Sequence, residues 1–143
     1  MPFTESKVKK GTLLHQRIMN NSNVNRLAGV DISKTGISLM QKSEIDDLHV
    51  IESSKNLCDY FDEKFDIIIA GEVLEHVSNM GIFLDSIKSV CDDNSLILIT
   101  VPNFAPIKRI FRLFWFNEVV HPDHVCYFSV STLSSLFDKN GLE

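Results

Sequence analysis

The sequence has little of what marks secreted, fibrous or membrane-spanning proteins. Its 143 residues include only three cysteines, four prolines and six glycines. The cysteines form no CxxC pair, which argues against a disulfide framework or a cysteine zinc site, and so little glycine and proline excludes collagen-like and low-complexity chains. No apolar run is long enough to span a bilayer, and residues 1–10 lack the apolar stretch of a secretory signal. We therefore expect one cytoplasmic domain, residues 1–143.

Positive charge is also scarce, since 14 Lys and Arg residues stand against 19 Asp and Glu residues, for a net charge of −5. This balance argues against a nucleic-acid partner held by the whole surface. What remains is the composition of a globular domain, with 44% hydrophobic and 23% charged residues. A chain of this length buries enough surface to fold without a disulfide or a metal.

Apolar periodicity predicts strands that alternate with helices. Ser33 at a predicted helix start and Gly141 after the last predicted helix are the residue types that helix ends prefer. Strands and helices alternate four times along the chain, which favours right-handed βαβ units. We therefore predict an α/β fold with a mostly parallel sheet and helices on both faces. The predicted strands are residues 27–32, 49–51, 65–70 and 95–101, and the predicted helices are residues 12–19, 33–42, 72–90 and 131–140.

Polar residues follow three of these predicted strands. Asp31 ends the first strand, Gly71 and Glu72 follow the third, and Asn103 follows the fourth. Ligands of open α/β sheets bind beyond the carboxyl ends of the strands, and an acidic residue at that place suits the hydroxyls of a ribose. A cap for the next helix explains Asp31 equally well, so both interpretations stay open.

Four motifs occur in the order found in class I S-adenosylmethionine-dependent methyltransferases. Residues 65–77, FDIIIAGEVLEHV, resemble the fourth strand and following turn of that family, and are most similar to its ubiquinone-biosynthesis and small bacterial branch. Residues 97–103 (ILITVPN) resemble the fifth strand, and residues 29–31 (GVD) resemble the second strand. Residues 121–129 (HPDHVCYFS) resemble the stretch that precedes the next helix of the family. The resemblance extends over residues 11–141 and implies a Rossmann-like fold.

The resemblance also implies a role for each matching residue. S-adenosyl-L-methionine is the implied methyl donor, and methylation of an oxygen of a small or lipid-like acceptor is the implied reaction. Glu75, His76 and His124 would face the acceptor as catalytic residues. The residues that would bind the cofactor are Gly11, Asp31, Ile32, Gly71 and Glu72.

The match departs from the family at both ends. The family has a glycine-rich loop of GxGxG type after its first strand, but aligning Gly11 with the last glycine puts Lys9 and Lys7 at the earlier ones. The resemblance thus implies an incomplete core that lacks most of the first strand and the last two strands. Open sheet edges bind other chains, so the alternative is a catalytically inactive fragment or pseudoenzyme that binds a protein partner there.

Glu72, Glu75 and His76 have the spacing i, i+3, i+4, which predicts that they share one face of a helix. Two carboxylates and an imidazole suit Mg²⁺ or another divalent cation. The arrangement resembles the metal site of quinone O-methyltransferases and that of small-RNA 2′-O-methyltransferases. The second resemblance implies a later histidine as a further ligand, for which His124 or His121 is the candidate. Two other interpretations stay open, since any first helical turn favours carboxylates, and His76 or His124 could act without a metal as a base or to position the substrate.

Residues 107–116, from Ile107 to Phe116, combine aromatic side chains with Lys108, Arg109 and Arg112. The resemblance implies that this segment forms a lid over the acceptor. A lid packed on the core, a lid for a hydrophobic substrate and contact with a membrane surface are the interpretations that we keep. Base stacking with a nucleic acid has the least support.

Overall fold

The computed structural model describes residues 14–42, 47–52, 56–103 and 121–142. Contacts divide the chain into two compact units, Met1–Lys55 and Asn56–Glu143, and each unit is described by itself. Gly11, the lysines at positions 7 and 9, and residues 107–116 lie outside the described residues, so what we expect of them stays a prediction. Among the helices of the described segments, none is both long enough and apolar enough to cross a membrane.

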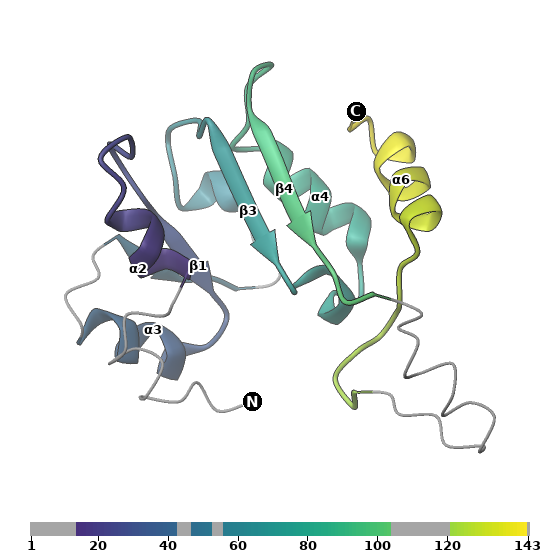
Figure 1. Ribbon diagram of the computed structural model, residues 1–143, viewed down its shortest axis with the longest axis horizontal. Coiled ribbons are helices and arrows are strands. Elements are labelled where there is room, and N and C mark those ends of the chain that lie inside the picture. Colours follow the sequence, from purple (N-terminus) through teal and green to yellow (C-terminus); the bar gives the residue numbers. More distant parts are fainter. Residues whose placement is uncertain (1–13, 43–46, 53–55, 104–120, 143) are drawn as a thin grey trace. The chain divides into compact units, whose positions relative to one another are not determined.

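The first unit contains a short parallel strand pair and two helices (Figure 1). Its elements are α2 (Leu14–Met19), β1 (Gly29–Asp31), α3 (Lys34–Gln41) and β2 (Leu48–Val50). The strands pair from Gly29 opposite Leu48 to Asp31 opposite Val50. Ile37 of α3 is buried against Leu48, with Met40 and Val50 packed around them. The apolar stripe of α3 therefore covers β2, as its helical spacing predicts.

The second unit is built on two parallel strands that lie side by side (Figure 1). β3 pairs with β4 from Ile67 opposite Leu96 to Gly71 opposite Thr100. Both strands end at the same edge, so the residues that follow Gly71 and Thr100 are brought together. The elements are η1 (Leu57–Asp59), β3 (Ile67–Gly71), η2 (Leu74–His76), α4 (Met80–Lys88), β4 (Leu96–Thr100) and α6 (Val130–Lys139), of which η1 and η2 are 3₁₀ turns.

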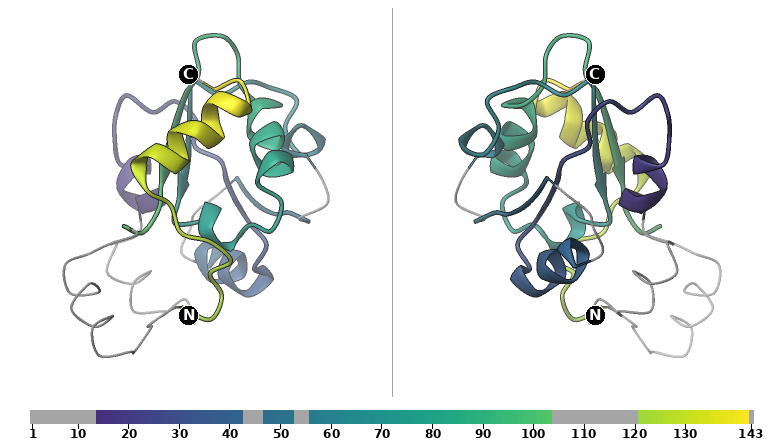
Figure 2. Two further views of the ribbon diagram at one scale, coloured as in Figure 1. Left: turned by 90° about the vertical axis from the view of Figure 1, so that its right-hand side faces the viewer. Right: turned by 90° about the vertical axis from the view of Figure 1, so that its left-hand side faces the viewer.

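Packing in the second unit centres on α4, which lies behind β4 in Figure 1. Leu84 and Ile87 of this helix are completely or almost completely buried, as are Leu74 before it and Val90 after it. The carboxyl ends of α4 and α6 lie close together (Figure 2), because Lys88 Nζ donates a hydrogen bond of 2.8 Å to the carbonyl of Asn140. These contacts hold both helices to one structural unit.

The strands of the second unit are less buried than their apolar sequences predict. Ile67 and Ile69 of β3 and Leu96 and Leu98 of β4 are 39–62% exposed, and they face each other in register. We call these four side chains the exposed row. Side chains alternate across a strand, so the exposed row occupies one face of this strand pair.

The predicted helix over residues 72–90 is also wrong in its first half. Glu72 has a φ of 56°, and its N–H donates to the Thr100 carbonyl at 2.9 Å, so Glu72 continues the strand ladder. A 3₁₀ turn follows, and α4 begins only after Asn79, whose side chain accepts a hydrogen bond from the Ile82 N–H at 3.2 Å. The cap at Asn79 therefore sets the helix start.

The end of α6 agrees with the prediction. Gly141 has a φ of 69°, in the left-handed region that glycine enters without steric cost. Its N–H donates to the Asp138 carbonyl at 3.2 Å, and the Leu142 N–H donates to the Phe137 carbonyl at 3.0 Å. This pair of bonds is the Schellman arrangement, which satisfies carbonyls that the helix leaves open.

Four strands and the helices between them lie close to the predicted positions, and both strand pairs are parallel. The α/β class and the parallel pairing are therefore confirmed at the level of each unit. A single sheet with helices on both faces, a single domain over residues 1–143, and the expected incomplete core stay predictions.

Candidate functional site

The candidate site of the second unit begins where β3 and β4 end. Thr100 Oγ1 lies 3.3 Å from Glu72 Oε1, to which it donates a hydrogen bond. An added Cβ at Gly71 would lie 3.5 Å from Thr100 Oγ1, which is ordinary van der Waals contact. The described neighbours therefore do not require glycine at position 71, and Glu72 points its carboxylate toward β4.

Glu75 lies on the 3₁₀ turn η2 and is 1% exposed. Its carbonyl accepts a hydrogen bond from the Val125 N–H at 2.9 Å. Its carboxylate oxygen Oε2 is buried and has no hydrogen-bond partner in the described structure. Buried polar atoms are nearly always satisfied, and leaving one unpaired costs about 1–3 kcal/mol. A water molecule or a ligand in contact with this oxygen would satisfy it.

His76 follows Glu75, and its ring is oriented by a backbone carbonyl. His76 Nδ1 lies 3.0 Å from the carbonyl oxygen of Asp123. A carbonyl only accepts, so Nδ1 carries the proton and, in the neutral ring, Nε2 keeps its lone pair. Nε2 lies 4.0 Å from Glu75 Oε1. The nitrogen available for a proton or a cation therefore lies beside the buried carboxylate.

His124 completes the group. Its Nδ1 is buried without a hydrogen-bond partner in the described structure, and its ring centroid lies 4.7 Å from that of His76, at an interplanar angle of 84°. One ligand atom each from Glu75, His76 and His124 can be chosen so that all three lie within 4.8 Å of one another. We call these three residues the Glu–His–His group.

The turn at residues 121–124 brings His124 to this place. The His124 N–H donates to the His121 carbonyl at 3.1 Å, with Pro122 at the second position, where its fixed φ favours a β-turn. An isolated parallel bridge between Asn103 and Phe128 holds the following segment beside the end of β4. A turn and a strand-like bridge thus carry His124 to the Glu75 side of the sheet edge.

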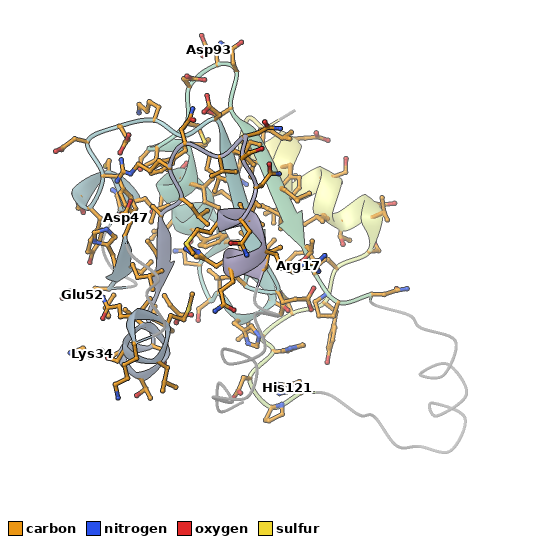
Figure 3. The ribbon with its side chains drawn as sticks, turned by 60° about the vertical axis from the view of Figure 1, so that its left-hand side comes forward. Arg17, Lys34, Asp47, Glu52, Asp93 and His121 are labelled. Carbon is orange, nitrogen blue, oxygen red and sulfur yellow. The ribbon has the colours of Figure 1, made fainter. Side chains whose placement is uncertain are left out.

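His121 lies at the start of this turn (Figure 3), beside the group and not within it. Its ring centroid is 4.8 Å from that of His124 and 6.2 Å from that of His76. Its Nδ1 accepts a hydrogen bond from the Asp123 N–H at 3.3 Å. Of the two late histidines that the sequence offers as ligands, the structure therefore brings His124 into the group.

The structure groups the candidate ligands differently from the helical spacing. Glu75, His76 and His124 lie together, whereas Glu72 contacts Thr100 and lies outside the group. The expectation that Glu72, Glu75 and His76 share a helical face is wrong, because a 3₁₀ turn replaces that helix. Sequence reasoning also missed the Asp123 carbonyl, for which the Pro-Asp pair, typical of turns, was the available signal.

Cys126 lies close enough to this group for Glu75 to affect it. Burial raises the pKa of the Cys126 thiol, and the negative charge of Glu75 raises it further. Cys126 is therefore a neutral thiol near the Glu–His–His group, which favours its role as a packing residue.

In the first unit, Asp31 ends β1 and its carboxylate is partly engaged. Asp31 Oδ1 accepts a hydrogen bond of 2.7 Å from the Ser33 N–H, and Ser33 Oγ in turn accepts from the Gly36 N–H at 3.0 Å. The N-cap of α3 is Ser33, so the interpretation of Asp31 as the cap is wrong. Asp31 is exposed, and Ile32 beside it is 70% exposed.

Comparison with known proteins connects both units to one family. A family model described as a methyltransferase domain matches residues 14–143. No curated protein and no solved structure matches the chain. The match includes the end of β1, with Asp31, and the whole Glu–His–His group. It covers most of the chain, and the chain therefore belongs to the methyltransferase domain family, a class I family with a Rossmann-like α/β fold and S-adenosylmethionine as its methyl donor.

Proposed function

We propose that this protein transfers a methyl group from S-adenosylmethionine to an oxygen atom of a small or lipid-like acceptor. The family supports methyl transfer, and one observation supports the choice of oxygen. The buried, unpaired Glu75 Oε2 lies with two imidazoles at the carboxyl edge of β3 and β4, where ligands of α/β sheets bind. Such a group either holds a cation beside a hydroxyl or takes its proton.

Residues of the first unit fit the methyl donor. Ser33 fixes Asp31 Oδ1, which leaves Oδ2 to accept from the ribose hydroxyls. The exposed side chain of Ile32 would lie against the adenine, Gly71 and Glu72 would flank the cofactor, and Gly11 would lie under its methionine part. The donor, when bound, supplies an electrophilic methyl on a sulfonium, and the protein aligns the acceptor oxygen with it.

The Glu–His–His group would act on the acceptor in one of two ways. The group offers three donor atoms, one each from Glu75, His76 and His124, to a divalent cation, Mg²⁺ or another. A cation bound there supplies positive charge that lowers the pKa of an acceptor hydroxyl. Without a cation, His76 Nε2 would accept the hydroxyl proton. The unpaired Glu75 Oε2 favours the cation, since a base needs only the imidazole.

A lipid-like acceptor has support from the surface beside the group. Val125, next to His124, is 57% exposed, and Val73, next to Glu72, is 39% exposed. Apolar side chains at the rim of a polar group suit an acceptor with an apolar body and a hydroxyl. A membrane surface contacted through residues 107–116 and a location in the cytoplasm are further parts of this proposal.

The alternative is a catalytically inactive module that binds a protein partner. The exposed row of Ile67, Ile69, Leu96 and Leu98 supports it, because contiguous apolar surface marks interaction sites. In that case the chain would fold and bind its partner without any affinity for the methyl donor.

Titration calorimetry with S-adenosylhomocysteine separates the two. For an enzyme we expect micromolar binding by the full chain, with at least about tenfold loss in Asp31→Ala because the ribose loses its charged acceptor. Asp93→Ala, which removes an exposed carboxylate in the turn before β4 (Figure 3), is the matched control and should bind like the parent.

No binding by a chain that circular dichroism shows to be folded would overturn the enzyme and leave the binding module. Equal binding by the parent and by Asp31→Ala would agree with the proposed methyl transfer but would show that Asp31 does not bind the cofactor.

A further inference from the structure

We propose that His15 is a positioning residue of the donor site: its uncharged ring, packed on Gly29, holds α2 against β1, and a proton on the ring releases α2. This role rests on the proposed function, because it concerns how the first unit binds the methyl donor beside Asp31. All of the residues involved lie in the first unit, Met1–Lys55.

The contact between α2 and β1 is made at Gly29, where the strand has no side chain. A Cβ added at Gly29 would lie 3.1 Å from His15 Cε1, 3.2 Å from His15 Nδ1 and 2.6 Å from Leu48 Cδ2. These distances are shorter than the ordinary contact distance of non-bonded atoms, so the imidazole and Leu48 fill the space that a side chain at position 29 would occupy. Glycine therefore lets α2 approach β1 closely (Figure 1).

The rest of α2 has little buried surface. None of its six residues is fully buried, and Leu14 and Met19 are 56% and 46% exposed. So short a helix is not stable in water by itself, and packing on the strand has to hold it. The half-buried His15 ring makes that contact, so the position of α2 depends on it.

Asp31 connects this contact to the methyl donor. Side chains alternate along a strand, so Gly29 and Asp31 belong to the same face of β1. Asp31 Oδ1 accepts a hydrogen bond from the Ser33 N–H at 2.7 Å, which leaves Oδ2 for the ribose hydroxyls in the proposed function. Release of α2 would loosen the strand that positions this carboxylate. We therefore expect weaker binding of the donor when α2 is released.

The burial of His15 makes this contact depend on pH. Burial lowers the pKa of His15 below its ordinary value of 6.5, and the negative charge of Asp47 partly opposes that change. The fold therefore favours the neutral ring. The stability that this preference contributes is complete above pH 6.5 and is lost as the pH falls from 6.5 through the lowered value.

The charges around His15 compensate a proton on its ring only in part. Asp47 is the acidic group that acts on the ring, and its carboxylate already binds Arg26 and His49, at 2.8 Å and 2.9 Å. The charged and titratable side chains of the described elements around β1 are Arg17 of α2, Arg26 of the following loop, Asp31 of β1, Lys34 of α3, Asp47 before β2 and His49 within it. A protonated His15 therefore lacks a full counter-charge among them, and we expect the ring to leave Gly29 for water.

Hydrogen exchange of α2 at several pH values, measured by NMR, tests the release of the helix. The Asn20 and Asn21 N–H groups donate to the Gln16 and Ile18 carbonyls, at 3.3 Å and 2.9 Å, so their protection relative to an unstructured amide reports whether α2 is formed. In the full chain we expect this protection to fall by up to about tenfold per pH unit below 6.5, because opening takes up one proton. His15→Phe keeps a ring of similar size that cannot be protonated, and its protection should not change with pH.

Calorimetric titration with S-adenosylhomocysteine over the same pH range tests the effect on the donor site. At neutral pH the affinities of the parent and His15→Phe should agree within about threefold. As the pH falls, the parent should lose affinity faster than His15→Phe, by up to about tenfold for each pH unit. His49→Phe, the matched control, removes an imidazole from β2 and should keep the pH dependence of the parent. His15→Gln, which is also uncharged at every pH, takes the place of His15→Phe if that variant does not fold.

Each other outcome has a defined meaning. A parallel loss of affinity in the parent and His15→Phe overturns the role of His15, and so does protection of α2 that stays constant while the His15 ring titrates. Loss of the pH dependence in His49→Phe assigns it to the Asp47 cluster and overturns the role as well. No binding of S-adenosylhomocysteine at any pH by the folded chain overturns the proposed function and any part of His15 in donor binding, whereas the exchange measurement separately decides whether His15 holds α2.

Discussion

Glu75 is a carboxylate in a place where proteins seldom keep one without a partner. Its side chain is buried on η2, and its Oε2 is unpaired in the described structure. Evolution tolerates such a cost at functional sites, where stability is exchanged for activity. The stability of the isolated chain should therefore increase when this polar group is removed.

Glu75→Met tests this, because methionine is unbranched and of similar length. We expect the free energy of unfolding to increase by about 1–3 kcal/mol, the cost of one unsatisfied buried polar group, as measured by urea denaturation without added metal. The methyl transfer that we propose should be lost in this variant, because the Glu–His–His group loses its carboxylate. Glu75→Gln leaves a polar group unpaired and should match the parent in stability. A less stable Glu75→Met variant would show that Glu75 has a partner in solution.

Asp47, in the first unit, is the centre of an ion cluster (Figure 3). Its Oδ2 lies 2.8 Å from Arg26 Nε, and its Oδ1 lies 2.9 Å from His49 Nε2. Hydrogen bonds from Arg26 and then His49 hold the pKa of Asp47 below its ordinary value of 3.8. A depressed carboxyl pKa in the folded state stabilises the fold above the ordinary value, and that stabilisation is lost as the pH falls through the folded one.

Asp47→Asn should therefore cost stability at neutral pH and little in acid. We expect a loss of about 0.5–1 kcal/mol at pH 7, the upper range for partly exposed ion pairs, and convergence of variant and parent as the pH falls through the lowered pKa of Asp47 in the folded state. Asparagine tolerates the φ of 54° at this position, so the backbone is preserved. An equal loss at both pH values in urea denaturation would mean that shape, and not charge, holds the cluster.

At the scale of elements, two glycines in similar helices have opposite roles. Gly141 ends α6 with a φ of 69°, and a Cβ added there would have no atom within 4 Å, so only its backbone conformation matters. Gly81 is the second residue of α4, and its added Cβ would meet nothing closer than 3.7 Å. Alanine is strained at the first position and favours the helix at the second.

Gly141→Ala should lower the thermal midpoint and Gly81→Ala should raise it. Each change corresponds to about 0.5–1 kcal/mol, and the two variants are controls for each other because they add the same methyl group. Shifts of the same sign in a calorimetric melt would contradict the assigned helix ends.

Some helices and strands could be predicted from the sequence, and others could not, because contacts between distant residues determine them. The strand at β3 and the helix at α3 follow from periodicity and from Ser33, which are local signals. The helix predicted from residue 72 does not form there for two reasons. The Glu72 N–H donates a hydrogen bond to the carbonyl of Thr100, which lies 28 residues further along the chain, and Asn79 caps the helix that begins after it. Local apolar spacing contains neither signal. Helical spacing does not explain the position of Glu75 beside His76, because a 3₁₀ turn carries both residues.

At the scale of the whole molecule, the family and the site were reached by different routes. Order of motifs indicated a methyltransferase, and the family match supports that conclusion. The Glu–His–His group joins η2 to the turn at residues 121–124, and no periodicity relates segments so far apart in sequence. Only the resemblance suggested His124, and only the structure separated it from His121 and excluded Glu72.

The contact between His76 and the Asp123 carbonyl closes a span of 47 residues, against 29 for the pairing of Ile67 with Leu96. Closing a longer span costs more chain entropy, although the cost grows only slowly with length. The position of the His76 ring therefore depends on a contact between two segments that the pairing of β3 with β4 does not itself join. A ligand that bound across this contact would stabilise it, because a ligand that binds only the closed arrangement favours that arrangement.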